Sequence, residues 1–372
     1  MIIGVPKEIK DNEYRVGLTP ASALEAVHHG HTVVVETNAG DGIDADDAAY
    51  RAAGASVVDG PEEIFAKADM IVKVKEPQAG ERAWLRQGQI IFTYLHLAAD
   101  PDQTRDLVNS RAVCVAYETV TDARGGLPLL MPMSQVAGRM AVQAGAHCLE
   151  KPQGGRGMLP GGVPGVHPAK IVIIGGGVVG ENAAYVALGI GADVTVLDRN
   201  VHVLRALNAR FGPSLKTIYS TGLTIEEQVL AADIVIGAVL VPGAEAPKLV
   251  TADHVKRMKR GSVVVDVAID QGGCFETSRP TTHAEPTYVV DGVVHYCVAN
   301  MPGAVSHTST YALNNVTLPF VLALADKGYK QAMRDDPHLM HGLNVHGGRI
   351  TYKAVADDLG YDYLDPREAI AA

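Results

Sequence analysis

The chain has 372 residues, of which 47% are hydrophobic, and it carries a formal net charge of −10 at pH 7. This length favours two globular domains, and the composition excludes a disordered or fibrous protein. The negative charge argues against nucleic acid or an anionic membrane surface as a partner, and no apolar run approaches the roughly 20 residues that a membrane span needs. The four cysteines form no C-x-x-C pair and the sequence opens on a strand pattern without a signal segment, so a cytoplasmic location is the simplest expectation.

Strand and helix patterns alternate through about the first 125 residues. The predicted strands are Ile2–Val5, Thr32–Glu36, Ser56–Val58, Met70–Lys75, Gln89–Leu95 and Ala112–Thr119. The predicted helices between them are Pro20–His29, Asp44–Ala53, Pro61–Ala68 and Pro101–Ser110. Strands separated by helices of this length predict a parallel, doubly wound sheet.

A second unit of the same kind follows a long helix, for which Ser134 is the predicted N-cap, and an irregular Gly- and Pro-rich segment at 153–168. Its predicted strands are Ile171–Ile174, Asp193–Leu197, Asp233–Val239, Ser262–Ile269 and Val293–Val298. A helix beyond Thr308 is expected to kink or end near Pro319, and the last 45 or so residues are expected to be helical.

These patterns predict an α/β fold with two doubly wound parallel-sheet domains. A Rossmann-type domain at 129–306 is inserted into a flavodoxin-like domain formed by 1–128 plus 307–372, and two long helices join them.

A G-x-G-x-x-G sequence, formed by Gly175, Gly177 and Gly180, lies between a predicted strand and a predicted helix. In this context the first glycine makes the turn, the second lets a pyrophosphate approach the backbone, and the third packs the helix against the sheet. Asp198 ends the next strand, where a carboxylate accepts hydrogen bonds from ribose hydroxyls and repels a 2′-phosphate. The pattern therefore predicts dinucleotide binding and favours NAD over NADP, although Arg199 beside it is a residue that would suit NADP.

Charged side chains gather at the predicted carboxyl ends of strands, where doubly wound sheets bind their ligands. They are Lys75, His96 and Glu118 in the first unit and Asp270 in the second, with Arg15 in a loop on the same side. Each alone has an ordinary structural explanation. Their convergence predicts an enzyme that acts on a small anionic substrate beside the nucleotide.

Several long motifs resemble those of alanine dehydrogenases, and the similarity runs nearly from end to end. They include GVPKEIKDNEYRVGLTP, KVKEP, FTYLHLA, LPLLMPMSQVAGRMA, GGRGMLPGGVPGV, VVDVAIDQGGCFETSRPTTH and CVANMPGAVSHTSTYALNN. The resemblance implies reversible, NAD-dependent oxidative deamination of L-alanine to pyruvate and ammonium, with glyoxylate as a further keto acid to test.

The resemblance also assigns roles to matching residues. Arg15 and Lys75 would hold the substrate carboxylate and carbonyl oxygen, His96 would be the general acid and base, and Asp270 would be the second catalytic residue. Besides the three glycines, the implied cofactor contacts are Ser134, Val178, Asp198, Ser220, Val239, Leu240, Val267, Ala268, Ile269, Asp270, Arg279, Val298, Ala299, Asn300 and Met301. For Val239, Leu240 and Val298 the sequence alone favours plain sheet core.

Two positions depart from the family pattern. Val203 stands where a basic residue is common, so a nucleotide contact there would be apolar. Lys327 stands where some members have a histidine that pairs with the acid matching Glu118 to hold a divalent ion, and a protonated lysine is a poor ligand. We therefore expect no metal, and the resemblance implies a homohexamer.

Three alternatives remain open. The nucleotide-binding subunit of a proton-translocating transhydrogenase shares the fold but lacks the counterpart of His96 and the context of Lys75. A saccharopine- or lysine-ketoglutarate-type dehydrogenase has similar domains without the alanine-type motifs. A silent NAD-binding regulator would not need the charged residues at the strand ends, and an activity assay separates it from the enzymes.

Overall fold

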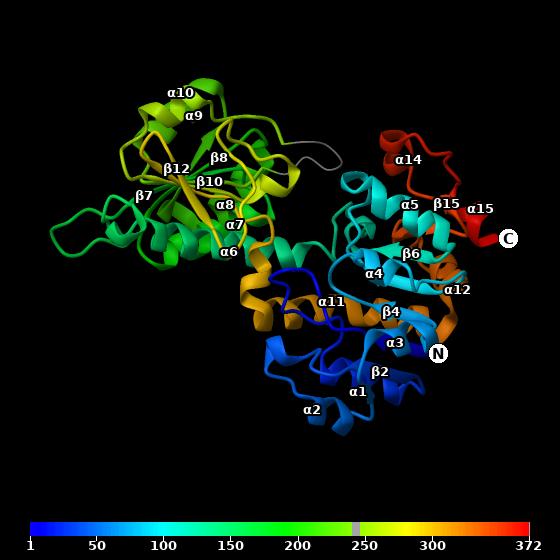
Figure 1. Ribbon diagram of the computed structural model, residues 1–372. Coiled ribbons are helices and arrows are strands. Elements are labelled where there is room, and N and C mark those ends of the chain that lie inside the picture. Colours follow the sequence, from blue (N-terminus) through cyan, green and yellow to red (C-terminus); the bar gives the residue numbers. More distant parts are fainter. Residues whose placement is uncertain (240–245, 372) are drawn as a thin grey trace. The chain divides into compact units, whose positions relative to one another are not determined.

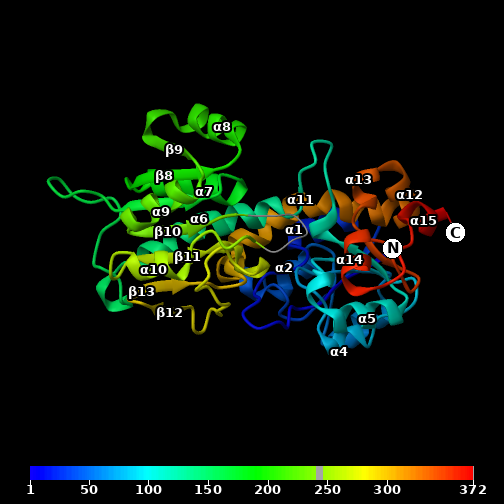
Figure 2. The same cartoon turned by 90° about the horizontal axis from the view of Figure 1, so that it is seen from above.

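The computed structural model describes residues 1–239 and 246–371, which form two compact units (Figures 1 and 2). Unit 1 consists of Met1–Met133 and Gly303–Ala372, and unit 2 is Ser134–Pro302. Each is a mostly parallel sheet with helices packed on it, so the predicted α/β class with two doubly wound sheets is confirmed. No helix among the described residues is long and apolar enough to cross a membrane.

The sheet of unit 1 has eight strands in the described part of the chain. In chain order they are β1 (Ile2–Val5), β2 (Thr32–Glu36), β3 (Ser56–Val58), β4 (Met70–Val72), β5 (Ile90–Thr93), β6 (Val113–Ala116), β14 (Leu343–His346) and β15 (Arg349–Ile350). Their order across the sheet is β15-β14-β6-β5-β4-β1-β2-β3. The order reverses at β1, which lies between β2 and β4, and this is where ligands bind in such sheets.

Helices connect these strands and cover the sheet of unit 1. They are α1 (Pro20–His28), α2 (Asp47–Ala52), α3 (Pro61–Lys67), α4 (Ala79–Arg82), α5 (Pro101–Ser110), α11 (Ser306–Lys327), α12 (Tyr329–Asp335), α13 (Pro337–Met340), α14 (Lys353–Leu359) and α15 (Pro366–Ala371), with short 3-10 helices η1 (Asp41–Ile43), η2 (Leu97–Ala99) and η3 (Tyr117–Thr119). The residues at the two ends of α1 are those expected of a helix start and a helix stop. Thr19 caps α1 with Pro20 as its first residue, and Gly30 after its end has a φ of 84°.

The sheet of unit 2 has seven strands in the described residues, in the order β12-β13-β11-β10-β7-β8-β9. They are β7 (Lys170–Ile174), β8 (Asp193–Asp198), β9 (Leu215–Tyr219), β10 (Ile234–Gly237), β11 (Val263–Asp266), β12 (Thr287–Val290) and β13 (Val293–Tyr296). The helices are α6 (Met131–Cys148), α7 (Val178–Gly189), α8 (Val201–Phe211), α9 (Gly222–Ala231) and α10 (Ala252–Arg257), with 3-10 helices η4 (Lys151–Gln153), η5 (Gly212–Ser214), η6 (Val267–Gln271) and η7 (Met301–Val305). The strand order reverses at β7, directly before the glycine-rich loop.

Some sequence predictions about helix ends are wrong. Helix α6 begins at Met131, so Ser134 lies in its first turn and is not the N-cap; Pro132 fits there because the first turn has no N–H partner to lose. Of the two outcomes expected at Pro319, a kink or an end, the end is excluded, because helix α11 runs through Pro319 to Lys327. The proline removes a single donor, whereas Val321 and Leu324 beyond it are completely buried and keep the helix packed.

The C-terminal segment is not only helical, as the sequence had suggested. Strands β14 and β15 form a hairpin, and β14 pairs antiparallel with β6 at the sheet edge. Helix α15 lies beside α12 in both views, where the Arg334 guanidinium donates a hydrogen bond to the carbonyl of Ile370 (Figures 1 and 2). The segment therefore completes the sheet and core of unit 1. All four cysteines are buried and free, so they act as small hydrophobic core residues.

Candidate active site

The three predicted site residues of unit 1 follow three neighbouring strands. Arg15 follows β1, Lys75 follows β4 and His96 follows β5. The prediction for β1 is confirmed, whereas those for β4 and β5 ran too long at the carboxyl end, because these strands end at Val72 and Thr93. Parallel neighbours end at the same edge of a sheet, so these side chains are carried by adjacent loops at the point where the strand order reverses.

Arg15 is a buried cation, with only 2% of its surface exposed. Its Nε donates to Glu13 Oε1 at 2.6 Å and its Nη2 to Glu13 Oε2 at 2.5 Å, while Nη1 lies 3.0 Å from the Met133 sulfur. Burial alone would lower the pKa of Arg15, but the hydrogen bonds and charge of Glu13 outweigh it and raise the pKa. Arg15 is therefore a permanent positive charge, and Glu13 holds its guanidinium in one orientation.

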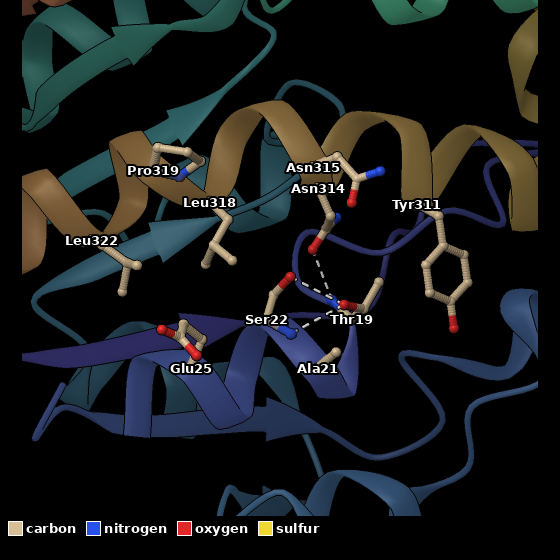
Figure 3. Close-up of a pocket in the computed structure, with 10 residues that line it drawn as sticks. All are labelled: Thr19, Ala21, Ser22, Glu25, Tyr311, Asn314, Asn315, Leu318, Pro319 and Leu322. Atoms are coloured by element: carbon tan, nitrogen blue, oxygen red, sulfur yellow. Dashed lines mark hydrogen bonds between the residues drawn. The ribbon is translucent and has the colours of Figure 1, made fainter. Parts of the chain in front are cut away.

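Helix α11 fixes the loop that carries Arg15. Asn314 accepts a hydrogen bond from the Thr19 backbone N–H at 2.8 Å and donates to the carbonyl of Gly17 at 3.2 Å. Figure 3 shows Asn314 directed at Thr19, whose hydroxyl in turn accepts from the N–H of Ser22 at 3.2 Å. A Cβ atom on Gly17 would lie 2.3 Å from the carbonyl oxygen of Val72, so the loop packs directly on the end of β4.

A groove of about 410 Å³ lies between α1 and α11 (Figure 3). It is lined by Thr19, Ala21, Ser22, Glu25, Tyr311, Asn314, Asn315, Leu318, Pro319 and Leu322. A second groove of about 440 Å³ lies in unit 2, between α6 and α7. Neither groove is lined by a predicted catalytic or substrate-binding residue.

Lys75 is half-buried beside Arg15. Burial, and after it the positive charge of Arg15, lower the pKa of Lys75 from the usual lysine value of 10.5. The carbonyl of Lys75 accepts a hydrogen bond from the Thr93 hydroxyl at 2.9 Å, which ties the loop after β4 to the end of β5. Because the positive charge of Arg15 acts on Lys75, a nearby anion would favour the charged form of the lysine.

His96 lies at a turn with a φ of 50°, a left-handed conformation that is uncommon for a residue with a side chain. Glu118 holds this turn, because its carboxylate accepts the backbone N–H of His96 at 2.6 Å and that of Leu95 at 3.2 Å. The His96 ring is stacked on Tyr94, with centroids 5.9 Å apart and planes inclined by 5°. Its side chain is 45% exposed, so the imidazole can reach a ligand, and its Nδ1 lies 4.0 Å from Glu118 Oε1.

The glycine-rich loop of unit 2 has the geometry that the sequence predicts. Gly175 has a φ of 102°, which favours glycine, and a Cβ on Gly180 would lie 1.8 Å from the Gly175 carbonyl oxygen. A Cβ on Gly177, in contrast, would meet no protein atom within 4 Å. Gly177 therefore leaves open space at the N-terminus of α7, the end of a helix at which folds of this kind bind phosphate groups. Val178 is the first residue of α7.

Asp198 ends β8 and is already engaged with this loop. Its Oδ2 accepts the backbone N–H of Gly176 at 2.7 Å, and its Oδ1 accepts that of Asn200 at 2.7 Å. The backbone N–H of Ser220 donates to the Asp198 carbonyl at 3.0 Å, so Ser220 lies beside it. Val203 would lie 2.8 Å from a Cβ on Gly176, which gives this side of the loop the apolar surface that the sequence indicated.

The other predicted cofactor residues differ in exposure. Strand β11 ends at Asp266, so the prediction that it reaches Ile269 is wrong; η6 carries Asp270, which is exposed, while Ala268 and Ile269 are buried. The Asp266 carboxylate causes the change of direction, because it accepts the N–H groups of Ala268 at 3.2 Å and Cys274 at 3.0 Å. Val267 is half-buried.

Arg279 is exposed, and its guanidinium carbon lies 4.2 Å from the centre of the Tyr288 ring. Val298 and Met301 are each 2% exposed, Ala299 is exposed, Asn300 is half-buried, and Ser134 is half-buried on α6. Val239 is half-buried and packs against the core of unit 2, and Leu240 lies outside the described residues. The burial of Val298 agrees with the sheet-core interpretation, which leaves only the backbone for a ligand contact.

Unit 1 contains a buried ion network that was not predicted from the sequence. Lys73 is completely buried, with its Nζ 3.1 Å from Glu8 Oε2 and 2.8 Å from Glu81 Oε1. Burial alone would lower the pKa of Lys73, but Glu8 and Glu81 raise it. The available signal was a lysine inside an apolar strand pattern, which needs an acid as partner.

Glu118 and Lys327, which match the two metal-binding positions of some family members, have other partners. Lys327 lies 2.6 Å from Asp335, and the Glu118 carboxylate accepts backbone N–H groups. Among the described residues no group of three or more His, Cys, Asp or Glu side chains is placed to hold a metal ion. The expectation of no metal stays a prediction.

Together, the fold, the glycine-rich loop and Asp198 are those of a nucleotide-binding α/β protein. Unit 1 carries the candidate cationic site, which consists of Arg15, Lys75 and His96. Two family models match, Alanine dehydrogenase/PNT N-terminal domain over residues 4–137 and Alanine dehydrogenase/PNT C-terminal domain over residues 141–353. The chain belongs to this alanine dehydrogenase/PNT family, as its motifs had indicated.

Curated relatives extend this similarity over the full length. The chain is 61% identical to an alanine dehydrogenase of Halomonas elongata, with 100% of both chains covered. It is 54% identical to an alanine dehydrogenase of Bacillus subtilis, covering 100% of this chain and 98% of the relative.

Two solved structures show the same two-unit architecture. An L-alanine dehydrogenase matches with a TM-score of 0.94 at 52% identity, covering 97% of this chain and 99% of that one. A transhydrogenase from Sinorhizobium meliloti matches with a TM-score of 0.81 at 27% identity, covering 95% and 100%. The similarity to alanine dehydrogenases is thus much the stronger.

Proposed function

We propose that this protein is an L-alanine dehydrogenase that converts L-alanine, NAD and water reversibly to pyruvate, ammonium and NADH. The observation that carries the proposal is the set of Arg15, Lys75 and His96 on neighbouring loops of one sheet edge. The full-length identity to alanine dehydrogenases supports it over a transhydrogenase subunit.

The chain's own residues suit each requirement of this reaction. Arg15 and Lys75 bind the substrate carboxylate and carbonyl oxygen. An anionic keto acid is well matched by two positively charged side chains that are largely shielded from water. His96 takes up the proton of the attacking water in deamination and returns it in amination, because its imidazole is exposed and histidine is the side chain most often used for general acid and base catalysis.

Unit 2 supplies the second catalytic residue and the residues that bind the cofactor. Asp270 is the second catalytic residue, whose negative charge favours the cationic imine carbon. The glycine-rich loop holds the pyrophosphate and Asp198 the adenosine ribose. NAD, when bound, accepts the hydride from the substrate Cα. A cytoplasmic, homohexameric enzyme belongs to the same proposal and rests on the family resemblance.

The first test is a direct assay. Purified protein is mixed with NADH, ammonium and pyruvate, and the loss of NADH absorbance is followed, with glyoxylate, 2-oxoglutarate and NADPH as parallel arms. Rapid oxidation that requires both ammonium and pyruvate is the expected result. Binding of NADH without any oxidation would contradict the proposal and favour a transhydrogenase-like or regulatory protein.

Gly177→Ala is expected to weaken NADH binding about 10- to 100-fold without lowering the melting temperature. The added methyl meets no protein atom, yet it occupies the space left for the pyrophosphate. Calorimetric titration with NADH and thermal unfolding measure the two effects. Gly189→Ala is the matched control, because its added methyl also meets nothing, at the far end of α7. Equal NADH affinity in both variants would contradict the assignment of the loop.

The affinity for pyruvate is expected to fall as pH rises, beginning below the usual lysine value of 10.5. The lowered pKa means that Lys75 loses its positive charge earlier than a free lysine, and the anionic substrate binds the charged form. Calorimetry with pyruvate and NADH, without ammonium, across alkaline pH measures this. Lys75→Arg keeps its charge throughout, so its profile should stay flat; a wild-type profile that is equally flat would exclude the role of Lys75.

A further inference from the structure

The loop that carries Lys75 is held by a side chain from another loop. Strand β4 ends at Val72, and beyond it the backbone N–H groups of Val74 and Lys75 donate to Glu8 Oε1 at 2.6 and 3.3 Å. With Thr93 donating to the Lys75 carbonyl at 2.9 Å, both peptide groups that flank Lys75 are fixed by side chains. We propose that Glu8 is a positioning residue for Lys75, setting the direction of its ammonium toward the substrate; this rests on the proposed function.

Glu8 is itself held in one place. Its second carboxylate oxygen lies 3.1 Å from Lys73 Nζ, and Lys73 lies 2.8 Å from Glu81. The side chains of Lys73, Glu8 and Glu81 are 0%, 2% and 2% exposed. Glu81 also accepts the N–H of Gln78 at 2.7 Å, at the start of α4. A carboxylate held between a buried ammonium and two backbone N–H groups has little freedom to move. The backbone of Lys75, which is bonded to this carboxylate, is therefore fixed as well.

Stability alone does not account for this network. A buried ion pair is often no more stabilising than well-packed apolar residues of similar volume. What the network supplies is a fixed acceptor for the backbone N–H groups of Val74 and Lys75. Glu36 makes the distinction testable, since it is another buried carboxylate influenced by the charge of Lys73, yet it accepts the N–H of Lys7 at 2.8 Å and not those of residues 74 and 75.

The experiment compares Glu8→Gln with Glu36→Gln in the full-length enzyme. Pyruvate affinity is measured by calorimetry with NADH and without ammonium, and KM and kcat by the NADH assay. We expect Glu8→Gln to weaken pyruvate binding and raise its KM about 10- to 100-fold, with a smaller change in kcat and unchanged NADH affinity. Glu36→Gln should change pyruvate affinity less than about twofold. Equal effects of the two variants would overturn the proposal.

A double-mutant cycle with Lys75→Ala tests whether Glu8 acts through Lys75. In the Lys75→Ala background, Glu8→Gln should alter pyruvate affinity by less than about twofold, because the group that it positions is gone. An undiminished effect of Glu8→Gln in that background would show a role independent of Lys75 and would overturn the proposal.

Two further measurements keep the outcome clear. If Glu8→Gln does not fold, Thr93→Val removes the other side-chain contact to the Lys75 peptide at nearly constant volume, and it should weaken pyruvate binding in the same selective way; normal affinity would overturn the proposal. The wild-type assay separates the two levels of inference. No turnover in the wild type sinks the proposed function, whereas an active wild type with an unaffected Glu8→Gln sinks only the role of Glu8.

Discussion

His96→Ala is expected to lower turnover about 100- to 10,000-fold while NADH affinity stays unchanged. His96 is the exposed imidazole of unit 1 that follows β5, held by the hydrogen bond from its N–H to Glu118 at 2.6 Å and stacked on Tyr94. The variant lacks the group that is proposed to exchange a proton with water or ammonia. Steady-state rates with pyruvate and ammonium, together with calorimetric titration of NADH, measure both quantities.

The matched control is His147→Ala. His147 is also an exposed histidine, with 61% of its side chain accessible and an acidic neighbour, but it lies on α6 and follows no strand of the cationic site. Its replacement should leave turnover within about twofold of the wild type. Turnover of His96→Ala near the wild-type rate would exclude His96 as the acid and base, even if the enzyme is an alanine dehydrogenase.

The features set by local sequence were predicted well. Alternating apolar strands and proline- or glycine-bounded helices gave both doubly wound sheets, and the G-x-G-x-x-G spacing gave the loop in which Gly180 packs on Gly175 while Gly177 faces open space. Such features depend on backbone conformation and periodicity over a few residues. The charged residues at strand ends followed from the same rule, because topology decides which loops share an edge.

Features that depend on distant contacts were missed. The Glu8–Lys73–Glu81 network joins three positions that are separate in sequence, and Asn314 of α11 holds the loop after β1. Periodicity contains no information on such pairs. The strand predictions around Lys75 and His96 ran too long for a related reason, since the backbone N–H groups of Val74 and His96 donate to the side chains of Glu8 and Glu118 and not to a neighbouring strand. The site thus begins where regular pairing ends.

Asp198→Ala is expected to shift the preference for NADH over NADPH by about 100-fold or more toward NADPH. A carboxylate beside the ribose repels a 2′-phosphate, and Arg199 next to it is the cation that would then attract one. The ratio of kcat/KM for the two cofactors, measured at fixed pyruvate and ammonium, reports the shift. An unaltered ratio would mean that another residue selects the cofactor.

The structure adds a second consequence, because Asp198 also holds the glycine-rich loop through Gly176 at 2.7 Å. Asp198→Ala should therefore weaken NADH binding as well, whereas Asp198→Asn keeps an oxygen for that N–H and removes only the charge. If charge repulsion selects the cofactor, Asp198→Asn should gain activity with NADPH while keeping most of its affinity for NADH. If Asp198 acts only by ordering the loop, Asp198→Asn should resemble the wild type with both cofactors, and the preference for NADH would have to arise from the shape of the loop.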